Sequence, residues 1–426
     1  MSFQQGLSGL NAASKNLDVI GHNIANSGTV GFKASRTEFA EMVATAIGTS
    51  STGNAGIGVQ VDAVAQQFTQ GNITVTGNNM DVAINGNGFF KILQPDGSYA
   101  YTRSGNFKLD NQGNVITNSN GKVMGYPVDP ATGKRTSSSP APLVFPTGAP
   151  IPAKQTKTIT ASFNLDARAP DAAGNPAATP PIPATPRSTY GTSINVYDSQ
   201  GVATTVNLYF QKTATANTWN VYTQLDDPTA TPPVVAAPIG QITFDNNGKI
   251  IGPAATPPAT GFQMPVTISP PTPNPNNLPA YTVQIDLDGV TQFGTKFAVS
   301  ELTQDGYTAG QLTGINIGND GTIMTSYSNG VTRAEGQIAL ASFRNTQGLA
   351  DIGNNMWTET YASGQPTMGA PTDGAFGALR SGALEDSNVD LTAELVNMMT
   401  AQRAYQANAQ TIKTQDQILS TIVNLR

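Results

Sequence analysis

The sequence predicts a multidomain α+β protein in which two terminal helices enclose nested, predominantly antiparallel β domains. Apolar residues recur every seven positions at both chain ends, Asn-Gly and Asp-Gly pairs fill the middle, and 24 of the 29 prolines fall between 140 and 279. Seven-residue spacing kept over several turns is typical of helices whose seam faces another helix. The turn pairs instead favour short strands joined by tight hairpins.

The C-terminal segment predicts the longer helix, from about 390 to 425. Neither Pro nor Gly interrupts residues 387–426, and at 1.5 Å per residue such a helix would be roughly 50 Å long. Ser387 followed by Asp390 offers a capping box at its start. Its apolar row consists of Leu391, Leu395, Met398, Tyr405, Ile412 and Leu419.

The N-terminal segment predicts a helix from about Ser2 to Ile24, ending before Asn26, Ser27 and Gly28. Its apolar row consists of Phe3, Leu7, Leu10, Leu17 and Ile24. A heptad stripe does not identify the helix that covers it. The two helices could therefore pack within one molecule, or pair with each other and then with neighbouring copies.

Strand and turn patterns divide the rest of the chain into a nested arrangement. Residues 71–139 and 289–360 have the same texture of short strands and turns, and apolar alternation persists inside the Pro-rich part, which favours a β domain over disorder. We predict a helical domain (1–30 and 385–426), a connecting segment (31–70 and 365–384) with a flexible loop at Gly48–Gly58, an inner β domain (71–145 and 289–364), and an inserted Pro-rich outer β domain (146–288).

Composition argues against several classes of partner and location. Only 12% of the 426 residues are charged and the net charge is −6, which argues against a nucleic-acid partner. There is no cysteine, so disulfides and thiolate metal sites are excluded. No apolar run approaches the length of a membrane span, and residues 1–30 lack the pattern of a cleavable secretory signal.

No residue pattern predicts an active site, and we expect no enzyme, cofactor or metal. His22 is the only histidine, and a lone His without a partner constellation is usually a packing or surface residue. The Asp-Gly turns lack the closing Glu of a calcium loop, and Gly86-Asn-Gly88 is not followed by a helix. No G-x-S-x-G elbow is present. Interaction surfaces are therefore expected to carry the function.

Several motifs occur together at both ends and in the inner β domain. They are Asn23-Ile24-Ala25-Asn26 followed by Gly31-Phe32-Lys33, then Asp81–Phe90 and Tyr101–Phe107, and finally Glu394–Met398 and Gln402-Arg403-Ala-Tyr405. In this order they resemble the family of bacterial flagellar rod and hook axial proteins. The insertion at 146–288, with Thr303–Tyr307 and Thr414–Leu419, is similar to hook members, whereas rod members lack a large insertion.

The resemblance implies a structural subunit that polymerises into a flexible curved tube, which couples the rod to the filament and transmits torque for swimming. The terminal helices would form a coiled-coil-like inner tube around a central export channel. The implied partners are other copies of the chain, the distal rod protein, the hook cap during assembly, the hook–filament junction proteins and the flagellar export apparatus. The implied location is extracellular, reached without a cleaved signal, with no nucleic-acid binding and no membrane insertion.

Two alternatives remain open. A distal rod or hook–filament junction protein would share both chain ends, although the central insertion argues against a rod protein. A secreted β-rich adhesin would explain the Pro- and Thr-rich domain, but it would not explain heptad rows at both termini. We further expect the terminal helices to be largely disordered in the free subunit and to fold on assembly.

Overall fold

The computed structural model describes residues 2–43, 56–130, 132–145, 150–175, 177–226, 236–255, 260–269 and 278–424. These residues form two compact units. The first comprises 1–148, 313–326 and 332–426, and the second comprises 149–312 and 327–331. Most of the regular structure is β, with one long α-helix near each end of the chain.

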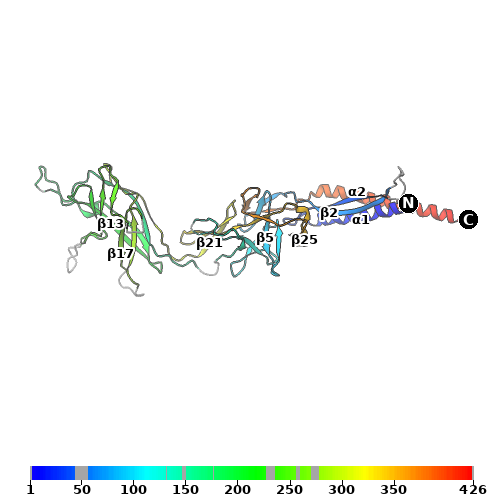
Figure 1. Ribbon diagram of the computed structural model, residues 1–426, viewed down its shortest axis with the longest axis horizontal. Coiled ribbons are helices and arrows are strands. Elements are labelled where there is room, and N and C mark those ends of the chain that lie inside the picture. Colours follow the sequence, from blue (N-terminus) through cyan, green and yellow to red (C-terminus); the bar gives the residue numbers. More distant parts are fainter. Residues whose placement is uncertain are drawn as a thin grey trace. The chain divides into compact units, whose positions relative to one another are not determined.

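The two expected helices are confirmed. Helix α1 (Ser2–Ala25) and helix α2 (Leu391–Asn424) pack along each other in the first unit, and the last turns of α2 extend past the N-terminal end of α1 (Figure 1). The helices approach closely because Gly6 and Gly9 present no side chain. A Cβ atom at Gly9 would lie 2.9 Å from Asn408 Nδ2, and one at Gly6 would lie 3.1 Å from Ile412 Cγ1.

The start of α2 differs from the expected capping box. The helix begins at Leu391, and the Asp390 carboxylate accepts hydrogen bonds from the backbone N–H groups of Thr392 (2.9 Å) and Ala393 (3.1 Å). Asp390 is therefore the N-cap residue, since its side chain satisfies donors that the first turn leaves free. Ser387 lies outside the helix, where its hydroxyl accepts from Val389 N–H at 3.3 Å.

A β-hairpin lies against α1, within the range 31–70 that the sequence assigned to a connecting segment. Strands β1 (Ser35–Val43) and β2 (Gly56–Gln66) pair antiparallel, with Phe39 opposite Val61. An isolated two-stranded hairpin is marginally stable in water, so packing on α1 supports it (Figure 1). Residues 48–55 of the expected Gly-rich loop lie outside the described residues, and Gly56–Gly58 begin β2.

The rest of the first unit is a β structure built mainly on a 13-stranded sheet, as far as the structure describes it. Its main path runs β21-β22-β23-β9-β5-β6-β26-β25, and two further two-stranded sheets pair β28 with β4 and β29 with β3. The strands of this unit are β3 (Ile73–Val75), β4 (Val82–Asn85), β5 (Phe89–Leu93), β6 (Tyr99–Thr102), β7 (Lys108–Leu109), β8 (Val115–Ile116), β9 (Lys122–Tyr126), β10 (Ala141–Pro142), β21 (Leu312–Ile317), β22 (Thr322–Tyr327), β23 (Thr332–Ile338), β24 (Leu340–Ser342), β25 (Ala350–Gly353), β26 (Met356–Thr358), β27 (Thr367–Gly369), β28 (Ala378–Ser381) and β29 (Ala383–Glu385), with a short 3₁₀ helix η2 (Thr346–Gly348).

An aromatic cluster lies beside the base of the hairpin. Phe89, Trp357 and Phe68 contact one another edge to face, with ring centroids 5.4 to 5.8 Å apart. The Trp357 indole N–H donates to the Gln66 side-chain oxygen at the end of β2. Such pairs add to the stabilisation from buried area, so this cluster joins the hairpin to the sheet.

Within its described residues, the second unit contains two five-stranded sheets around a separate core. One sheet has the order β17-β18-β11-β19 with β20 also paired to β11, and the other has the order β12-β13-β14-β15-β16. Trp219, Phe163 and Phe210 are among its largest buried side chains. The elements are β11 (Thr158–Asp166), η1 (Arg187–Thr189), β12 (Gly191–Tyr197), β13 (Ala203–Lys212), β14 (Thr218–Tyr222), β15 (Gly240–Phe244), β16 (Ile250–Gly252), β17 (Gln263–Ile268), β18 (Tyr281–Asp286), β19 (Thr291–Phe293) and β20 (Ala298–Gln304).

Candidate functional site: a buried polar junction

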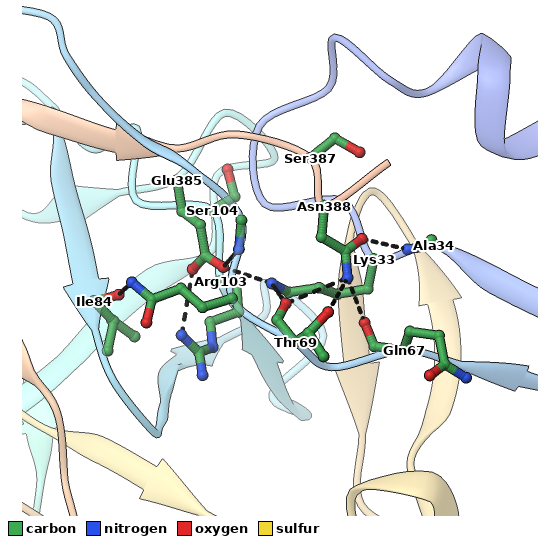
Figure 2. A network of polar contacts seen from close by, with 12 residues as sticks. Lys33, Ala34, Gln67, Thr69, Ile84, Arg103, Ser104, Glu385, Ser387 and Asn388 are labelled. Carbon is green, nitrogen blue, oxygen red and sulfur yellow. Dashed lines mark hydrogen bonds and ion pairs between the residues drawn. The ribbon is translucent and has the colours of Figure 1, made fainter. Parts of the chain in front are cut away.

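A buried network of polar side chains lies where the terminal segments meet the β structure of the first unit. We name it the polar junction and define it by Asn23, Lys33, Arg103, Glu385 and Asn388. Figure 2 shows these contacts around Glu385 and Asn388. The residues come from the end of α1, the segment before β1, the loop after β6, the end of β29 and the segment before α2. The junction therefore gathers residues from both ends of the chain.

Glu385 is the centre of the junction. Its carboxylate oxygen Oε1 lies 2.5 Å from Lys33 Nζ and accepts from Gly71 N–H at 3.0 Å, while Oε2 lies 3.3 Å from Arg103 Nη1. The side chains of Lys33 and Glu385 are fully buried. Lys33 Nζ also donates to the Thr69 carbonyl at 2.7 Å. Buried charges are tolerated when they are paired and hydrogen-bonded in this way.

The junction holds two cations and one carboxylate. Burial lowers the pKa of Lys33, an effect that Glu385 opposes and the nearby Arg103 guanidinium reinforces. Burial likewise lowers the pKa of Arg103, again opposed by Glu385. Arg103 Nε is buried and has no hydrogen-bond partner among the described residues. Glu385 is thus the carboxylate that compensates both cations, and its loss would leave two positive groups buried together.

Two asparagines bind the backbone around this ion cluster. Asn23 is buried, accepts from Ser35 N–H at 2.8 Å, donates to Ser35 O at 2.8 Å, and donates to Glu394 Oε1 of α2 at 3.2 Å. Asn388 accepts from Ala34 N–H at 2.7 Å and donates to Gln67 O at 2.7 Å. Each amide therefore holds the start or end of the hairpin against a helical segment.

Gly31 allows the chain to turn into the junction. Its φ of +71° lies in the left-handed region that favours glycine. A Cβ atom there would lie 2.7 Å from Ser104 N. Its N–H donates to the Glu385 carbonyl at 2.8 Å. The next residue, Phe32, is buried and contacts the His22 ring at 5.5 Å between centroids.

The structure separates the expected motif residues into two groups. Asn23, Gly31, Phe32 and Lys33 converge on the junction, and Asn26 lies beside it, donating to His22 O at 3.0 Å. Ile24 is half-buried and Ala25 is exposed. Gln402 and Arg403 are exposed on α2 and take no part in the junction.

The expected apolar rows are only partly used within one molecule. Among the described residues, the apolar α1 side chains that are buried are Ala12, Ala13, Val19 and Ile20. From the predicted rows, Leu10, Leu17, Ile24, Met398 and Ile412 are half-buried, whereas Phe3, Leu7, Leu391, Leu395, Tyr405 and Leu419 are exposed. The packing of α1 on α2 within one molecule therefore leaves large apolar side chains of both helices uncovered.

Sequence reasoning missed Glu385 and Asn388 as junction residues. One signal was available, because Lys33 follows Phe32 in an apolar, Gly-containing stretch and a buried lysine needs an anion. Nothing in the sequence identified which of the 28 acidic residues supplies it.

Two open cavities flank β25 on the side of α1. The larger, of about 800 Å³, is lined by residues of 22–32, 102–106, 117–119 and 351–356. The smaller, of about 390 Å³, lies between α1, β2 and residues 347–351. Asp351 and His22 border both. Across the described residues, no group of three or more His, Cys, Asp or Glu side chains is placed to hold a metal ion, and neither described α-helix has the length and apolarity to span a membrane.

Family models match most of the chain in the order that the motifs suggested. A flagella basal body rod protein model matches residues 3–33, a flagellar hook protein FlgE/F/G D1 domain model matches 83–162, a flagellar basal body protein FlaE D2 domain model matches 164–307, and a flagellar basal body rod FlgEFG protein C-terminal model matches 380–425. The chain is also 43% identical over 434 residues to the flagellar hook protein FlgE of Salmonella typhimurium, and the match covers 100% of both chains. The chain belongs to the flagellar hook protein family.

Other members of the hook family support the same conclusion. The flagellar hook protein FlgE of Escherichia coli is 42% identical over 435 residues, and that of Borreliella burgdorferi is 33% identical over 452 residues, with at least 99% of each chain covered. The crystal structure of Helicobacter pylori flagellar hook protein FlgE2 superposes with a TM-score of 0.52 at 16% identity, covering 73% of this chain and 100% of that one. That likeness shows a shared fold.

The polar junction can now be placed within the hook family. Its N-terminal residues Asn23 and Lys33 fall in the first matched segment, and Glu385 and Asn388 fall in the last. Arg103 falls in the D1 segment. The junction is thus built by three separately matched segments of the family.

Proposed function

We propose that this chain is the structural subunit of a bacterial flagellar hook and that it polymerises with its own copies through its terminal helices. Full-length similarity to hook proteins supports this proposal over a rod or junction protein, because the D2 domain model matches residues 164–307, which include most of the central insertion at 146–288. The single observation that carries the polymerisation step is the uncovered apolar surface of α1 and α2.

That surface is large for a single subunit in water. Leu395 and Met399 of α2 are 50% and 53% exposed, and Phe3 and Leu7 of α1 are similarly exposed. Ile418 and Leu419, near the C-terminal end of α2, are exposed as well. Burying a large apolar side chain contributes roughly 1.5–3 kcal/mol, so packing against neighbouring copies would drive assembly. A contact between different surfaces of two copies that does not close into a ring gives a helical filament.

The finer features of the function follow from this proposal. Packed terminal helices would form an inner coiled-coil-like tube around a channel, with the β domains outside it. The tube would couple rod to filament and transmit torque, with the distal rod protein, hook cap, junction proteins and export apparatus as partners. We place the protein outside the cell, in the hook, as a structural subunit without enzymatic activity.

The four-part domain division belongs to the same proposal. Residues 1–30 and 385–426 would supply cohesion. The inner β domain was predicted at 71–145 with 289–364 and the outer one at 146–288, but β19 and β20 pair with β11 of the second unit, so the outer domain would extend to about residue 312. The hairpin within 31–70 lies against α1 and is joined to the sheet through Gln66. We therefore expect this connecting segment to transmit force between the helices and the β domains.

Assembly tests the proposal directly. We expect wild-type chain to form sedimentable tubes, visible by electron microscopy, above a critical concentration. Leu395→Asp should abolish tubes, because a carboxylate would be buried without a partner. Asn111→Asp, which introduces the same charge at an exposed turn, should assemble normally. Wild-type chain that stays monomeric at every concentration tested, with a hook cap supplied, would contradict the proposal.

A second measurement tests folding on assembly. In dilute solution, limited proteolysis should remove the terminal segments of the free subunit, and the polymer should protect them. If the dilute subunit keeps both ends intact, the helices are stable without neighbours, and the α1–α2 contact seen here is sufficient to order them.

A further inference from the structure

Tyr361 is the most exposed large side chain among the exposed hydrophobics of the described residues. Its exposure is 105% of the reference value, whereas the next, Val75, reaches 68%. It lies in the turn between β26 and β27, which we name the 360–364 turn. Packing inside this subunit does not use the ring. Tyrosine combines an apolar ring with a polar hydroxyl, so an uncovered one can make both kinds of contact outside the chain.

The 360–364 turn is held in place by hydrogen bonds within the turn and to neighbouring segments. Thr360 N–H donates to Ser363 Oγ at 2.9 Å, Thr360 Oγ1 donates to Gly348 O at 2.5 Å, and Asn345 Nδ2 donates to Ala362 O at 3.1 Å. Ser363 is only 1% exposed, so it fixes the turn to the unit. A side chain held on a preorganised turn loses little conformational freedom on binding.

The larger cavity beside β25 offers a complementary surface, and we name it the α1–β25 cavity. The apolar part of its wall includes Val30, Phe32 and Met356. Amide and hydroxyl groups in the wall come from Asn106, Asn118 and Ser119. Its volume of about 800 Å³ exceeds that of one ring and leaves room for a turn. None of the residues of the 360–364 turn lines it, so the chain does not fill the cavity with its own tyrosine.

We propose that the 360–364 turn of one copy docks into the α1–β25 cavity of a second copy, with Tyr361 as the anchor. The inference rests on the proposed function, since it assumes a polymer of this chain. A phenol ring can pack against Phe32 and the Met356 thioether while its hydroxyl bonds an amide or hydroxyl of the wall. Tyrosines seated in pockets are over-represented among residues that dominate interface energy.

The geometry suits an open helical assembly. The turn and the cavity are different surfaces of the same unit, so their contact between two copies is heterologous and can repeat indefinitely. Docking of the turn would add a contact between β domains that requires one particular side chain, whereas apolar packing between the terminal helices depends less on individual residues. It would also cover His22 and Asn26 at the end of α1, which border the cavity.

Cross-linking in the polymer tests the contact, because the chain contains no cysteine. Tyr361→Cys and Asn118→Cys would be made as separate single variants, one of them isotopically labelled. Both would be incorporated as minor components of wild-type polymer, so that tubes form even if either change weakens assembly. A short bis-maleimide should then join residue 361 of one copy to residue 118 of another, as read by mass spectrometry. Dilute unpolymerised chain should give no such product.

A control variant and a second readout complete the test. Asn111→Cys, exposed on another turn of the same unit, should give no cross-link with Tyr361→Cys. Tyr361→Ala should raise the critical concentration about 10- to 30-fold, whereas Tyr361→Phe should change it only about 3-fold or less. Tubes of normal appearance that lack the 361–118 product, or equal critical concentrations for Ala and wild type, would overturn the inference and leave the proposed function standing. Wild-type chain that never polymerises would overturn the proposed function itself.

Discussion

Lys33 Nζ and Glu385 Oε1 lie 2.5 Å apart although 352 residues separate them in the chain. Arg103 of the β structure contacts the other oxygen of the same carboxylate. Both chain ends are therefore fastened to the β sheet at one buried point. A load applied to the terminal helices would reach the β domain through this point and through the hairpin beside it.

Glu385→Gln should strongly destabilise the first unit. It removes the carboxylate that compensates two buried cations, and breaking a buried ion pair by removing one partner costs about 3–5 kcal/mol. The free energy of unfolding can be followed by Trp357 fluorescence in a Trp219→Phe background, because Trp357 lies in the aromatic cluster of this unit.

An exposed ion pair supplies the control for that change. Glu38 pairs with Arg36 at 2.7 Å, but both side chains are well exposed, so Glu38→Gln should cost about 1 kcal/mol or less. Adding Lys33→Met to Glu385→Gln should recover part of the loss, because it removes one uncompensated charge. Equal costs for Glu385→Gln and Glu38→Gln would show that the junction does not stabilise the unit.

Gly31→Ala should destabilise the first unit, whereas Gly28→Ala should not. Gly31 has φ of +71° and its added Cβ would meet Ser104 N at 2.7 Å, whereas nothing lies within 4 Å of a Cβ at Gly28. A left-handed non-glycine residue costs about 1–3 kcal/mol, and the backbone clash adds to it. Chemical denaturation of the two variants measures the difference. Similar midpoints would indicate that the 28–33 segment can shift without loss.

Gly9→Leu should separate α1 from α2. A side chain at Gly9 would meet Asn408, whereas Gly21 on the same helix has nothing within 4 Å. Overpacking of this kind costs about 1–3 kcal/mol, and Gly21→Leu should instead stabilise α1 slightly through its higher helix propensity. The melting of the helical circular dichroism signal in the polymer distinguishes the two. A higher melting temperature for Gly9→Leu would contradict the close approach of the helices.

The Asp-x-x-Gly turns should make the fold sensitive to acid. The Asn114 side chain at Asp110 and the Lys249 N–H at Asp245 hold the pKa of each carboxyl below its usual value. A lowered folded-state pKa means that the stabilisation is present above about pH 4, near the unfolded pKa, and is lost as pH falls through the folded pKa.

Asp245→Asn provides the test in the second unit, with Trp219 fluorescence in a Trp357→Phe background as the reporter. The variant should be less stable than wild type at neutral pH and should lose less stability between neutral and acidic pH. Parallel stability curves for the two proteins would show that Asp245 does not contribute to the acid dependence.

Sequence patterns predicted the helices and turns whose conformation depends on residues close together in the chain. Helix α1 was expected at 2–24 and is found at Ser2–Ala25, because its periodicity and its Asn-Ser-Gly end are properties of one segment. The turn glycines Gly86, Gly97 and Gly321 all have positive φ, as their Asn-Gly and Asp-Gly pairs indicated. The hairpin strand β1 was missed, because a two-stranded ribbon on a helix lacks the regular alternation of a half-buried strand.

The sequence by itself determined the two long helices, the β-rich middle, the hairpin turns and the family, since each depends on spacing or motif order along the chain. Only the tertiary structure decided that Lys33 pairs with Glu385 and Arg103, and that Asn388 binds the ends of the hairpin. It also decided which helix residues face each other, because glycines rather than leucines set the distance between α1 and α2. These contacts join residues hundreds of positions apart, and short-range propensity carries no information about which of many polar side chains will be buried together.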